Sequence, residues 1–596
     1  MRRLLPSAAL LLVWLSSSTS LTAANERLQN AASAFLRQQA NSPVDWMPWG
    51  EEAFARAAKE GRPLYVAVGG TSSELSAAMN RQTFSNREIA AFLNETFVCV
   101  LVDRDEYPAL AAQGQAYVRA VKQLSGWPLN LWLTPELLPF DGATYLPPSE
   151  EWGKEGFLNA AQRVAAAWKQ DPARAREAAR EAIALIREFE MPARTERFRG
   201  GEVRTSLQGS AAAWRDQSDS ERGGFGETPR HPEPEMLRFM LRADTETANA
   251  AAANLRATLR SALRDPVDGG FFRYTSDPAA RLPYFQKRLS DQARMTLALL
   301  DAAEITGDTT FADAARATLD YVLTQLARPD GGFHAGQDAT DTGARAYYVW
   351  TYRDLTQAIG REASAIAEAY GAKPDGNVSR EDDPSAALLG QNILAGAPNP
   401  AHAAALAKLR AVRGRRPAPA VDPTVVANEQ GLILLALARA GRELKEPRFT
   451  EAAQATASFI KKTFGDPKSG LRRLAGSNAP AGPEDYAAIA LGLRALSGDE
   501  SEAEPWLREA DARFLDSNDG ILYTTTAELP RGLWLRLPTP ASTPGDSIAP
   551  APLRLIAGDP FPEQLAALIA TQHRDASLPA SGDVLLALRL YVDRLP

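Results

Sequence analysis

The first third of the chain alternates between short apolar runs and longer stretches whose apolar residues have helical spacing. The runs 64–68, 96–103 and 129–133 are rich in valine, leucine and other apolar residues, which predicts buried strands. The stretch 108–124 has the spacing of a helix, and 139–146 contains an Asp-Gly pair that predicts a hairpin. Strands that alternate with helices and end in a hairpin predict an α/β domain.

The turn after the first run is the most informative stretch of this domain. Gly69 and Gly70 end the run, a polar turn follows, and a helix begins near Leu75. Thioredoxin-like folds present a Cys-x-x-Cys pair on such a strand-turn-helix unit, because the helix N-terminus stabilises a thiolate. Here the two cysteine positions are Ser73 and Ser76. A serine hydroxyl cannot form a disulfide, so we expect a thioredoxin-like fold without its redox chemistry.

The dipeptide Trp127-Pro128 stands directly before the third apolar run. In thioredoxin-like proteins a cis-proline at this place faces the redox turn, so we predict that Pro128 is cis. An ordinary trans proline at the entrance of a strand is the alternative.

From Asp291 onward the pattern becomes helical and repetitive. Pairs of amphipathic stretches end in a glycine followed by an apolar residue, at 331–333, 470–471 and 520–521, with related turns at 223–226 and 269–271. A helical hairpin cannot bury its apolar face alone, so the copies must pack side by side. About five or six copies would close into an (α/α)6 toroid, and an open solenoid is the alternative that the repeat alone leaves open.

Composition narrows the classes of function. At 596 residues the chain is too long for one core, and 45% hydrophobic and 23% charged residues are typical of a globular protein. The net charge of -7 and the lack of a basic block disfavour nucleic-acid binding. The one cysteine, Cys99, lies in a predicted strand, and the four histidines show no metal-ligand spacing. We therefore expect no disulfide within the chain, no metal site and no cofactor.

The N-terminus has the composition of a secretory signal. Arg2 and Arg3 supply positive charge, the apolar run 4–15 follows, and 16–24 is small and polar. The apolar run is shorter than the ~20 residues of a membrane-spanning helix. We predict cleavage after Ala24 and export to the periplasm or the medium, with no transmembrane segment in the mature chain; an uncleaved anchor is the alternative. The expected parts are a signal peptide at 1–24, a thioredoxin-like domain at 26–175 and a toroid at 176–596.

Four long segments carry a resemblance to a known family. They are NSPVDWMPWGEEAF, LNETFVCVLVDRDEYP, SGWPLNLWLTPELLPFDGATYLPP and GGFGETPRHPEP, and they occur in this order. The chain thereby resembles the thioredoxin-domain-containing proteins that include the spermatogenesis-associated members of animals and the YyaL-type bacterial proteins. That family usually carries Cys-His-Trp-Cys-His where this chain has Ser73-Glu74-Leu75-Ser76-Ala77. The resemblance implies a thioredoxin-like domain followed by a six-hairpin glycosidase-like domain, in a degenerate member to which the oxidoreductase activity does not carry over.

The resemblance also indicates where a site in the second half would lie. Six-hairpin and sugar 2-epimerase-like domains hold sugar in a funnel lined by aromatic residues and carboxylates, and acid–base chemistry there needs two facing acidic groups. Where the family pattern has a histidine and a glutamate, this chain has Tyr284 and Gln286, and Gln337 replaces a further acid. An amide keeps hydrogen bonding but cannot transfer a proton. The remaining candidate acids are Asp291, Asp338, Asp422, Glu484 and Asp485, and the candidate pocket residues are Tyr284, Gln286, Gln337 and Tyr486.

These observations support three hypotheses about function. The first is an exported two-domain protein that no longer catalyses and acts by binding or scaffolding. The second is a carbohydrate-active enzyme, either a sugar 2-epimerase or a glycoside hydrolase, that uses acids of the funnel. The third is peptide binding by the Trp127-Pro128 loop without redox chemistry. The expected ligand is a carbohydrate, a peptide or another protein, and no nucleic acid.

Overall fold

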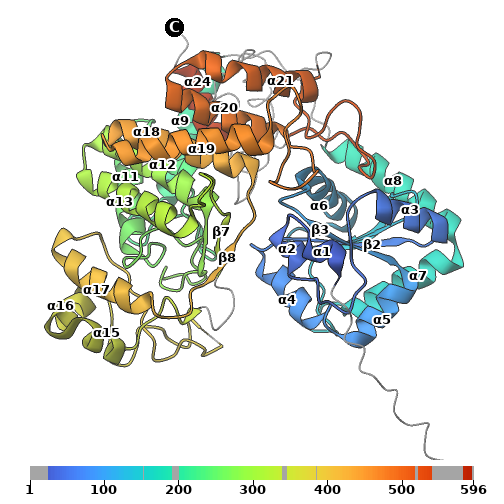
Figure 1. The fold of residues 1–596 in the computed structure, drawn as a ribbon, viewed down its shortest axis with the longest axis horizontal. Helices are drawn as coiled ribbons and strands as arrows, with labels where there is room; N and C mark the ends of the chain where they lie inside the picture. The colour runs from blue at the N-terminus through green and yellow to red at the C-terminus, as the bar shows by residue number, and fades with distance from the viewer. Residues whose placement is uncertain are drawn as a thin grey trace, which may run out of the picture.

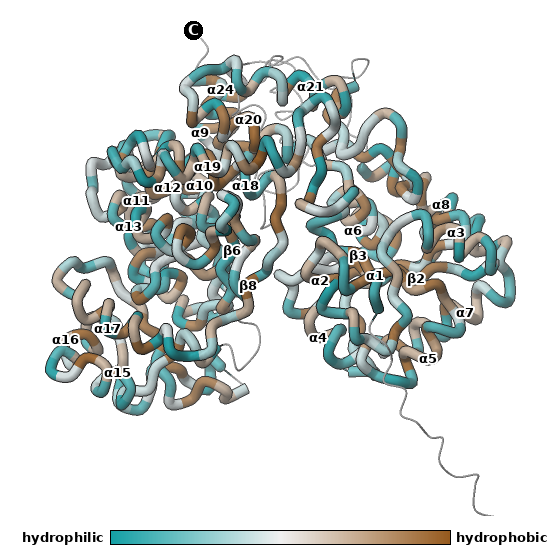
Figure 2. The backbone as a smooth tube through the Cα atoms, in the orientation of Figure 1, coloured by the Kyte–Doolittle hydropathy of each residue, from teal (hydrophilic) through white to brown (hydrophobic). Residues whose placement is uncertain are grey.

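The computed structural model describes residues 25–151, 153–190, 200–338, 345–383, 385–516, 521–539 and 582–593. The predicted signal peptide at 1–24 lies outside these residues. Within them, a part built around a β-sheet stands beside a larger helical part (Figure 1). Hydrophobic residues gather in the middle of each part (Figure 2). None of the described helices is long and apolar enough to span a membrane.

A five-stranded sheet forms the centre of the first part. Its strands are β1 (Met47–Pro48), β2 (Leu64–Gly69), β3 (Val98–Asp103), β4 (Leu129–Leu133) and β5 (Pro139–Ala143). They lie in the order β1-β3-β2-β4-β5; β1, β3 and β2 are parallel, whereas β4 and β5 are antiparallel to their neighbours. The three predicted strands are confirmed. A hairpin is present, but its turn lies at 134–138, whereas Asp141 and Gly142, which were predicted to form the turn, lie inside β5.

Helices cover both faces of this sheet. They are α1 (Glu26–Gln29), α2 (Ala34–Arg37), α3 (Glu51–Glu60), α4 (Glu74–Gln82), α5 (Arg87–Thr96), α6 (Pro108–Lys122), α7 (Phe157–Gln170) and α8 (Pro172–Glu190). Side chains alternate along a strand, so Leu64, Val66 and Val68 pack with α3, α6 and α8, whereas Tyr65 and Ala67 pack with α4, α5 and α7. Helix α8 runs across residue 175, the expected end of this domain, and packs on α6 and β5. The fold is thioredoxin-like, as predicted.

The helical part has an inner and an outer layer. The inner helices are α10 (Pro234–Leu241), α12 (Leu289–Thr306), α18 (Ala427–Glu443), α20 (Pro483–Ser497) and α24 (Gly582–Val592). They follow one another in space in the order α24, α10, α12, α18, α20. The outer helices are α9 (Gly200–Gln217), α11 (Thr245–Arg260), α13 (Thr309–Tyr321), α19 (Pro447–Phe464) and α21 (Glu504–Phe514). The inner helices are buried on nearly all sides, as helices enclosed by a second layer must be, and this is the predicted α/α toroid.

A repeated hydrogen-bond clamp fixes where the inner helices begin. Gln430 is the fourth residue of α18; its Oε1 accepts from the N–H of Phe333 (2.9 Å) and its Nε2 donates to the same residue's carbonyl (3.0 Å). Gln292, the fourth residue of α12, makes the same pair of bonds to Phe271 (2.7 and 2.9 Å). Both partners belong to the Gly-Gly-Phe turns of the sequence repeat. The clamp satisfies buried backbone groups of the turn and joins it to the start of an inner helix.

A lobe that was not predicted from the sequence is formed mainly by the chain between α13 and α18. Its three short strands pair in the order β6 (Gln286–Arg288), β7 (Gly336–Asp338) and β8 (Ala420–Asp422), and β6 comes from the segment directly before α12. Its helices are α15 (Tyr352–Ile359), α16 (Ala363–Ala369) and α17 (Ala403–Arg413), at the lower left of Figure 1. Elements this short contain too few turns or alternations to produce a periodic signal.

A segment of the helical part, residues 521–539, reaches across to the thioredoxin-like domain and is called the strap here. Trp534 is buried in the core formed by β2, β3, α3 and α6, and its indole N–H donates to the carbonyl of Leu137 (2.8 Å). Gln113 of α6 accepts from the N–H of Trp534 (2.7 Å) and donates to the carbonyl of Leu535 (2.7 Å). The strap therefore supplies part of the first domain's hydrophobic core.

Truncating Trp534, the buried residue of the strap, should lower the stability of both domains. We expect Trp534→Ala to lower the free energy of unfolding by about 3–5 kcal/mol, the usual cost of truncating a buried tryptophan. Urea unfolding followed by circular dichroism measures this change. Phe189→Ala, at a position 66% exposed on α8, is the control and should leave stability unchanged. Equal stabilities of Trp534→Ala and the wild type would contradict the packing of the strap.

Candidate functional site at the domain interface

The turn that would carry the redox cysteines contains two buried serines. Ser73 precedes α4, and its hydroxyl oxygen accepts from the N–H of Ser76 (3.2 Å), which makes it a helix cap. Ser76 is buried beneath it. The thiol of Cys99 lies inside β3, where burial raises its pKa well above the ordinary value. The turn itself therefore has no group that can form a disulfide.

The peptide bond between Trp127 and Pro128 is cis, as predicted. Pro128 and Ser76 line the same very small cavity of about 10 Å³. The guanidinium of Arg104 lies 4.9 Å from the ring centroid of Trp127 and donates to the hydroxyl of Ser72. The turn and the proline loop are thus held together by Arg104.

This turn is docked onto the toroid. The hydroxyl of Thr71 donates to Oδ2 of Asp422 (2.6 Å), and Nε2 of Gln286 donates to the carbonyl of Thr71 (3.4 Å). Two residues predicted from the sequence, Asp422 and Gln286, therefore meet the thioredoxin-like domain. Oε1 of Gln286 is buried and has no hydrogen-bond partner among the described residues.

The loop after β3 makes a second set of contacts with the toroid. Nη2 of Arg288 lies 3.4 Å from Oδ2 of Asp105 and 3.0 Å from Oε1 of Glu429. Nε of Arg473 donates to the carbonyl of Asp105 (2.9 Å). Glu106 accepts from the hydroxyl of Ser477. A buried guanidinium from the toroid is thereby shared between carboxylates of both domains.

Glu429 is a site residue that the sequence analysis missed. Burial raises its pKa to about 7, with the carboxylates of Asp105 and Asp422 adding to the effect and Arg288 opposing it. Within the part of the chain that the structure describes, its Oε2 has no hydrogen-bond partner. The sequence does contain a pattern that could have identified Glu429. Asp291, Glu429 and Asp485 are each the third residue of an inner helix. Acids in this position are favoured by the helix dipole, and here they also bring carboxylates to one end of the toroid.

A second group of polar residues surrounds Asp291, where α10 and α12 begin. It lines a small cavity of about 20 Å³ together with His231, Glu233, Arg273 and Arg294. Glu233 has a left-handed backbone (φ 45°), which is strained for a residue with a side chain. Burial raises the pKa of Glu233, and the carboxylates of Glu235, Asp583 and Asp291 add to this against the opposing charge of Arg294.

A strip of aromatic rings connects this cavity with the docked turn. The ring of His231 lies 5.1 Å from that of Tyr274, which stacks on Tyr284 at 4.8 Å and 5°. Burial, together with the nearby carboxylate of Glu74, raises the pKa of Tyr274 to about 12 and that of Tyr284 further. Glu74 is the first residue of α4, so the strip lies close to the thioredoxin-like domain. Tyr284, a predicted pocket residue, lies within this strip, and no residue that the structure describes forms a hydrogen bond with its hydroxyl.

Comparison with known proteins agrees with this architecture. Residues 25–187 match a family model described as a thioredoxin DsbH domain, a protein of unknown function (DUF255). Spermatogenesis-associated protein 20 of Homo sapiens is 33% identical over 581 residues, covering 86% of this chain and 73% of the human protein. The Mus musculus protein is 32% identical over 574 residues, covering 86% of this chain and 72% of its own length. The chain belongs to the spermatogenesis-associated protein 20 family.

Solved structures resemble the helical part of this family member more distantly. Cellobiose 2-epimerase from Spirochaeta thermophila has a TM-score of 0.39 at 18% identity, covering 66% of this chain and 97% of the epimerase. Unsaturated glucuronyl hydrolase from Bacillus sp. has a TM-score of 0.33 at 12% identity, covering 74% of this chain and 90% of the hydrolase. At such scores the likeness carries no conclusion about activity.

Several residues predicted to line a pocket in this family member have structural roles instead. Tyr486 is buried in the toroid core, and its hydroxyl oxygen accepts from the N–H of Leu471 (3.0 Å), the third version of the turn clamp. Oε1 of Gln337 accepts from the hydroxyls of Tyr321 (2.8 Å) and Tyr348 (3.4 Å). These side chains satisfy buried groups of the toroid itself.

The five candidate acids do not form one cluster. Asp485 accepts from the N–H groups of Asn428 (2.9 Å) and Gly482 (2.8 Å) and pairs with Arg473 (2.7 Å), which also binds Glu484 (3.0 Å). These bonds use both oxygens of Asp485 and give it a structural role. Asp338 lies half-buried in β7 beside Gln286. Asp422 lies at the docked turn, and Asp291 lines the cavity that contains Glu233.

The titration of Glu429 can be tested directly. Because the pKa of its carboxyl is about 7 in the folded protein and 4.5 by reference, the folded state holds an extra proton between these values. The free energy of unfolding should therefore fall as pH rises through this interval. Glu429→Gln stays neutral, so its stability relative to the wild type should grow with pH, by up to about 3 kcal/mol.

Chemical unfolding between about pH 5 and pH 8 measures this difference. The comparison with the wild type is needed because Asp103 also contributes. Burial and the charge of Asp105 raise the pKa of Asp103 to about 8, so the free energy of unfolding falls with rising pH in both proteins for this reason as well. Glu52→Gln, on an exposed side chain of α3, is the control and should follow the wild type. Parallel curves for Glu429→Gln and the wild type would contradict a neutral Glu429.

Proposed function

We propose that the protein acts by binding and not by thiol redox chemistry, with the thioredoxin-like domain serving as a fixed cap over one end of the toroid. The observation that carries this proposal is the docked serine turn. Ser73 and Ser76 occupy the cysteine positions, and the neighbouring Thr71 is bonded to Asp422 and Gln286 of the toroid. A turn used in this way is a structural contact and not an open redox face.

The proposed ligand is a carbohydrate bound where the cap meets the toroid. Sugars combine apolar C–H faces, which pack on aromatic rings, with hydroxyl groups that donate to carboxylates. The stacked rings of Tyr274 and Tyr284 and the carboxylates of Glu233 and Asp291 offer these two kinds of contact. Export is part of the same proposal and rests on the signal-like composition of residues 1–24.

The binding proposal predicts stabilisation by sugar. Thermal unfolding of the protein without residues 1–24 should shift with at least one member of a panel of mono- and oligosaccharides. A ligand at about 100 times its Kd adds about 2.7 kcal/mol. Tyr274→Ala should abolish the shift, because it removes one face of the aromatic strip. Ile305→Ala, an exposed position on α12, should retain it. An unchanged midpoint across the panel would reject a carbohydrate ligand.

A second candidate function is a carbohydrate-active enzyme. It is favoured by one observation, namely that Glu233 and Asp291 line the same cavity and that the pKa of Glu233 is raised, as expected of a general acid. The five acids predicted from the sequence would then contribute only Asp291.

The enzyme alternative is decided by turnover of sugars that bind. Release of reducing sugar and formation of a 2-epimer should both be measured. If catalysis occurs, Glu233→Gln and Asp291→Asn should each lower kcat by about 10²-fold or more, whereas Asp338→Asn should change it little. Binding without turnover by the wild type would reject the enzyme and leave the binding function.

A further inference from the structure

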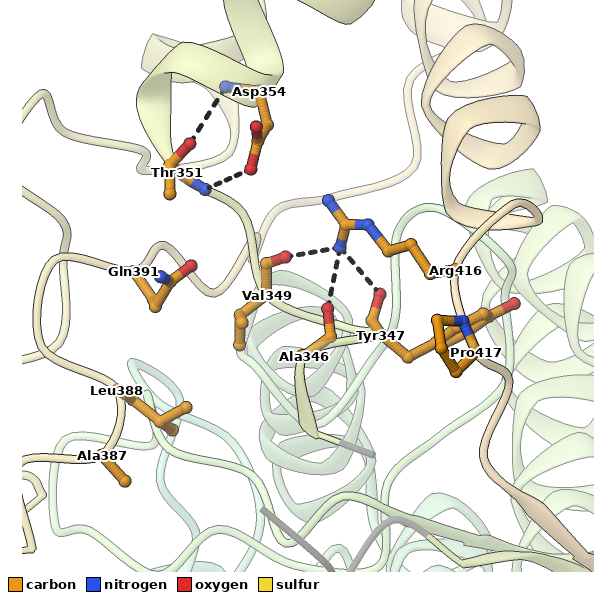
Figure 3. A pocket seen from close by; sticks show the side chains of 10 residues that line it. All are labelled: Ala346, Tyr347, Val349, Thr351, Asp354, Ala387, Leu388, Gln391, Arg416 and Pro417. Carbon is orange, nitrogen blue, oxygen red and sulfur yellow. Dashed lines mark hydrogen bonds between the residues drawn. The ribbon is translucent and has the colours of Figure 1, made fainter. Parts of the chain in front are cut away.

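A cavity of about 370 Å³ lies in the lobe of α15, α16 and α17, and neither the fold nor the proposed function uses it. Its walls come from the segment before α15, from 387–391 and from the chain after α17, as Figure 3 shows. The volume falls in the range of pockets that hold small molecules. Its lining combines the apolar Val349 and Leu388 with the polar side chains of Tyr347, Gln391 and Arg416.

The orientation of Arg416 on this wall is fixed. Its guanidinium lies over the ring of Trp350, 3.9 Å from the centroid. One terminal nitrogen, Nη1, donates to the carbonyls of Ala346 (3.0 Å), Tyr347 (3.0 Å) and Val349 (2.7 Å). In Figure 3 the other terminal nitrogen points away from these three carbonyls. The side chain is thus held in place by one edge while its remaining donors stay available.

Arg416 lacks a counter-ion among the described residues. Three positions earlier, Arg413 pairs with both Asp265 (2.7 Å) and Asp268 (2.9 Å). No carboxylate of the described residues pairs with Arg416, and the nearby Asp354 is bonded through its carboxylate to the N–H of Thr351. Burial lowers the pKa of Arg416 and the positive charge of Arg413 lowers it further, whereas the carboxylate of Asp354, which lines the same cavity, raises it. Neutral carbonyls compensate a half-buried charge less well than an anion does, so an anion in the cavity would be stabilised by Arg416.

We propose that this cavity binds a small anionic molecule, with Arg416 holding its carboxylate or phosphate group. The guanidinium can offer two parallel N–H donors to either group, the geometry in which arginine binds such anions best. The body of the ligand lies against Tyr347, Val349 and Leu388, and the amide of Gln391 contacts its polar edge. The site is separate from the aromatic strip and from the capped end of the toroid.

Three probes with the same ring test the proposal: glucuronate, glucose 6-phosphate and neutral glucose. Calorimetric titration of the whole protein should show at least one anionic probe binding at least about tenfold more tightly than glucose. The preferred anion then distinguishes a carboxylate from a phosphate ligand. Failure of both anions to bind more tightly than glucose would overturn the proposal.

Two variants place the binding in this cavity. Arg416→Gln removes the charge, and Ala387→Trp fills the cavity from an exposed position of its wall, so it decides the question if Arg416→Gln does not fold. Both should weaken anion binding at least about tenfold. Arg415→Gln, an exposed arginine next in sequence, should leave it unchanged. Binding retained in Ala387→Trp would overturn the assignment.

Tyr274→Ala separates this site from the proposed carbohydrate site. It should leave anion binding intact even though it removes the effect of neutral sugars at the domain interface. Loss of anion binding in Tyr274→Ala would place the anion at the interface and overturn the proposal. If neutral sugars produce no thermal shift, the carbohydrate proposal is rejected, but tighter binding of an anionic probe would still support the anion site.

Discussion

The shared guanidinium of Arg288 is the interaction on which the two-domain architecture depends. This side chain is buried, and a buried cation is tolerated only when carboxylates and hydrogen bonds compensate its charge. One carboxylate, Glu429, comes from the toroid, and the other, Asp105, comes from the thioredoxin-like domain. Separating the domains would remove the carboxylate of Asp105 from this cation. The thioredoxin-like domain is therefore a constituent of the toroid's end and not an independent module on a linker.

The same end of the toroid is organised by the repeated helix starts. In α12, α18 and α20 the third residue is an acid and the fourth clamps the turn of a neighbouring hairpin. The clamp fixes where each inner helix begins. The acid, which directly precedes the clamping residue, therefore lies at the same end of the toroid in all three helices. Each acid then has a different role. Asp485 forms an ion pair with Arg473, Glu429 forms an ion pair with Arg288 through one of its two oxygens, and Asp291 lines a cavity.

Loss of the cysteines is consistent with this arrangement. In a thioredoxin-like fold the turn after β2 must remain open to react with another protein's thiols. Here Thr71 is bonded to Asp422, and Glu74 lies near the stacked tyrosines of the toroid. Ser73 keeps the helix cap that the fold needs, because its hydroxyl oxygen accepts from a helix N–H group as other capping residues do. The strand-turn-helix unit of the thioredoxin-like fold is thus kept, and it serves as a contact with the toroid.

The sequence by itself determined the parts of the protein. Alternating apolar runs gave the strands at Leu64–Gly69 and Val98–Asp103, and the Gly-Gly-Phe repeat gave the paired helices, because both signals are local periodicities. The serines at 73 and 76 and the cis bond before Pro128 were also foreseen. Only the tertiary structure decided how the candidate side chains are used. Tyr486 and Gln337 make hydrogen bonds inside the toroid, and Glu429, Glu233 and Arg416 were missed, because burial and hydrogen-bond partners are set by contacts that form only when the chain folds. Asp105 and Glu429 meet at one guanidinium only after both domains have folded and docked.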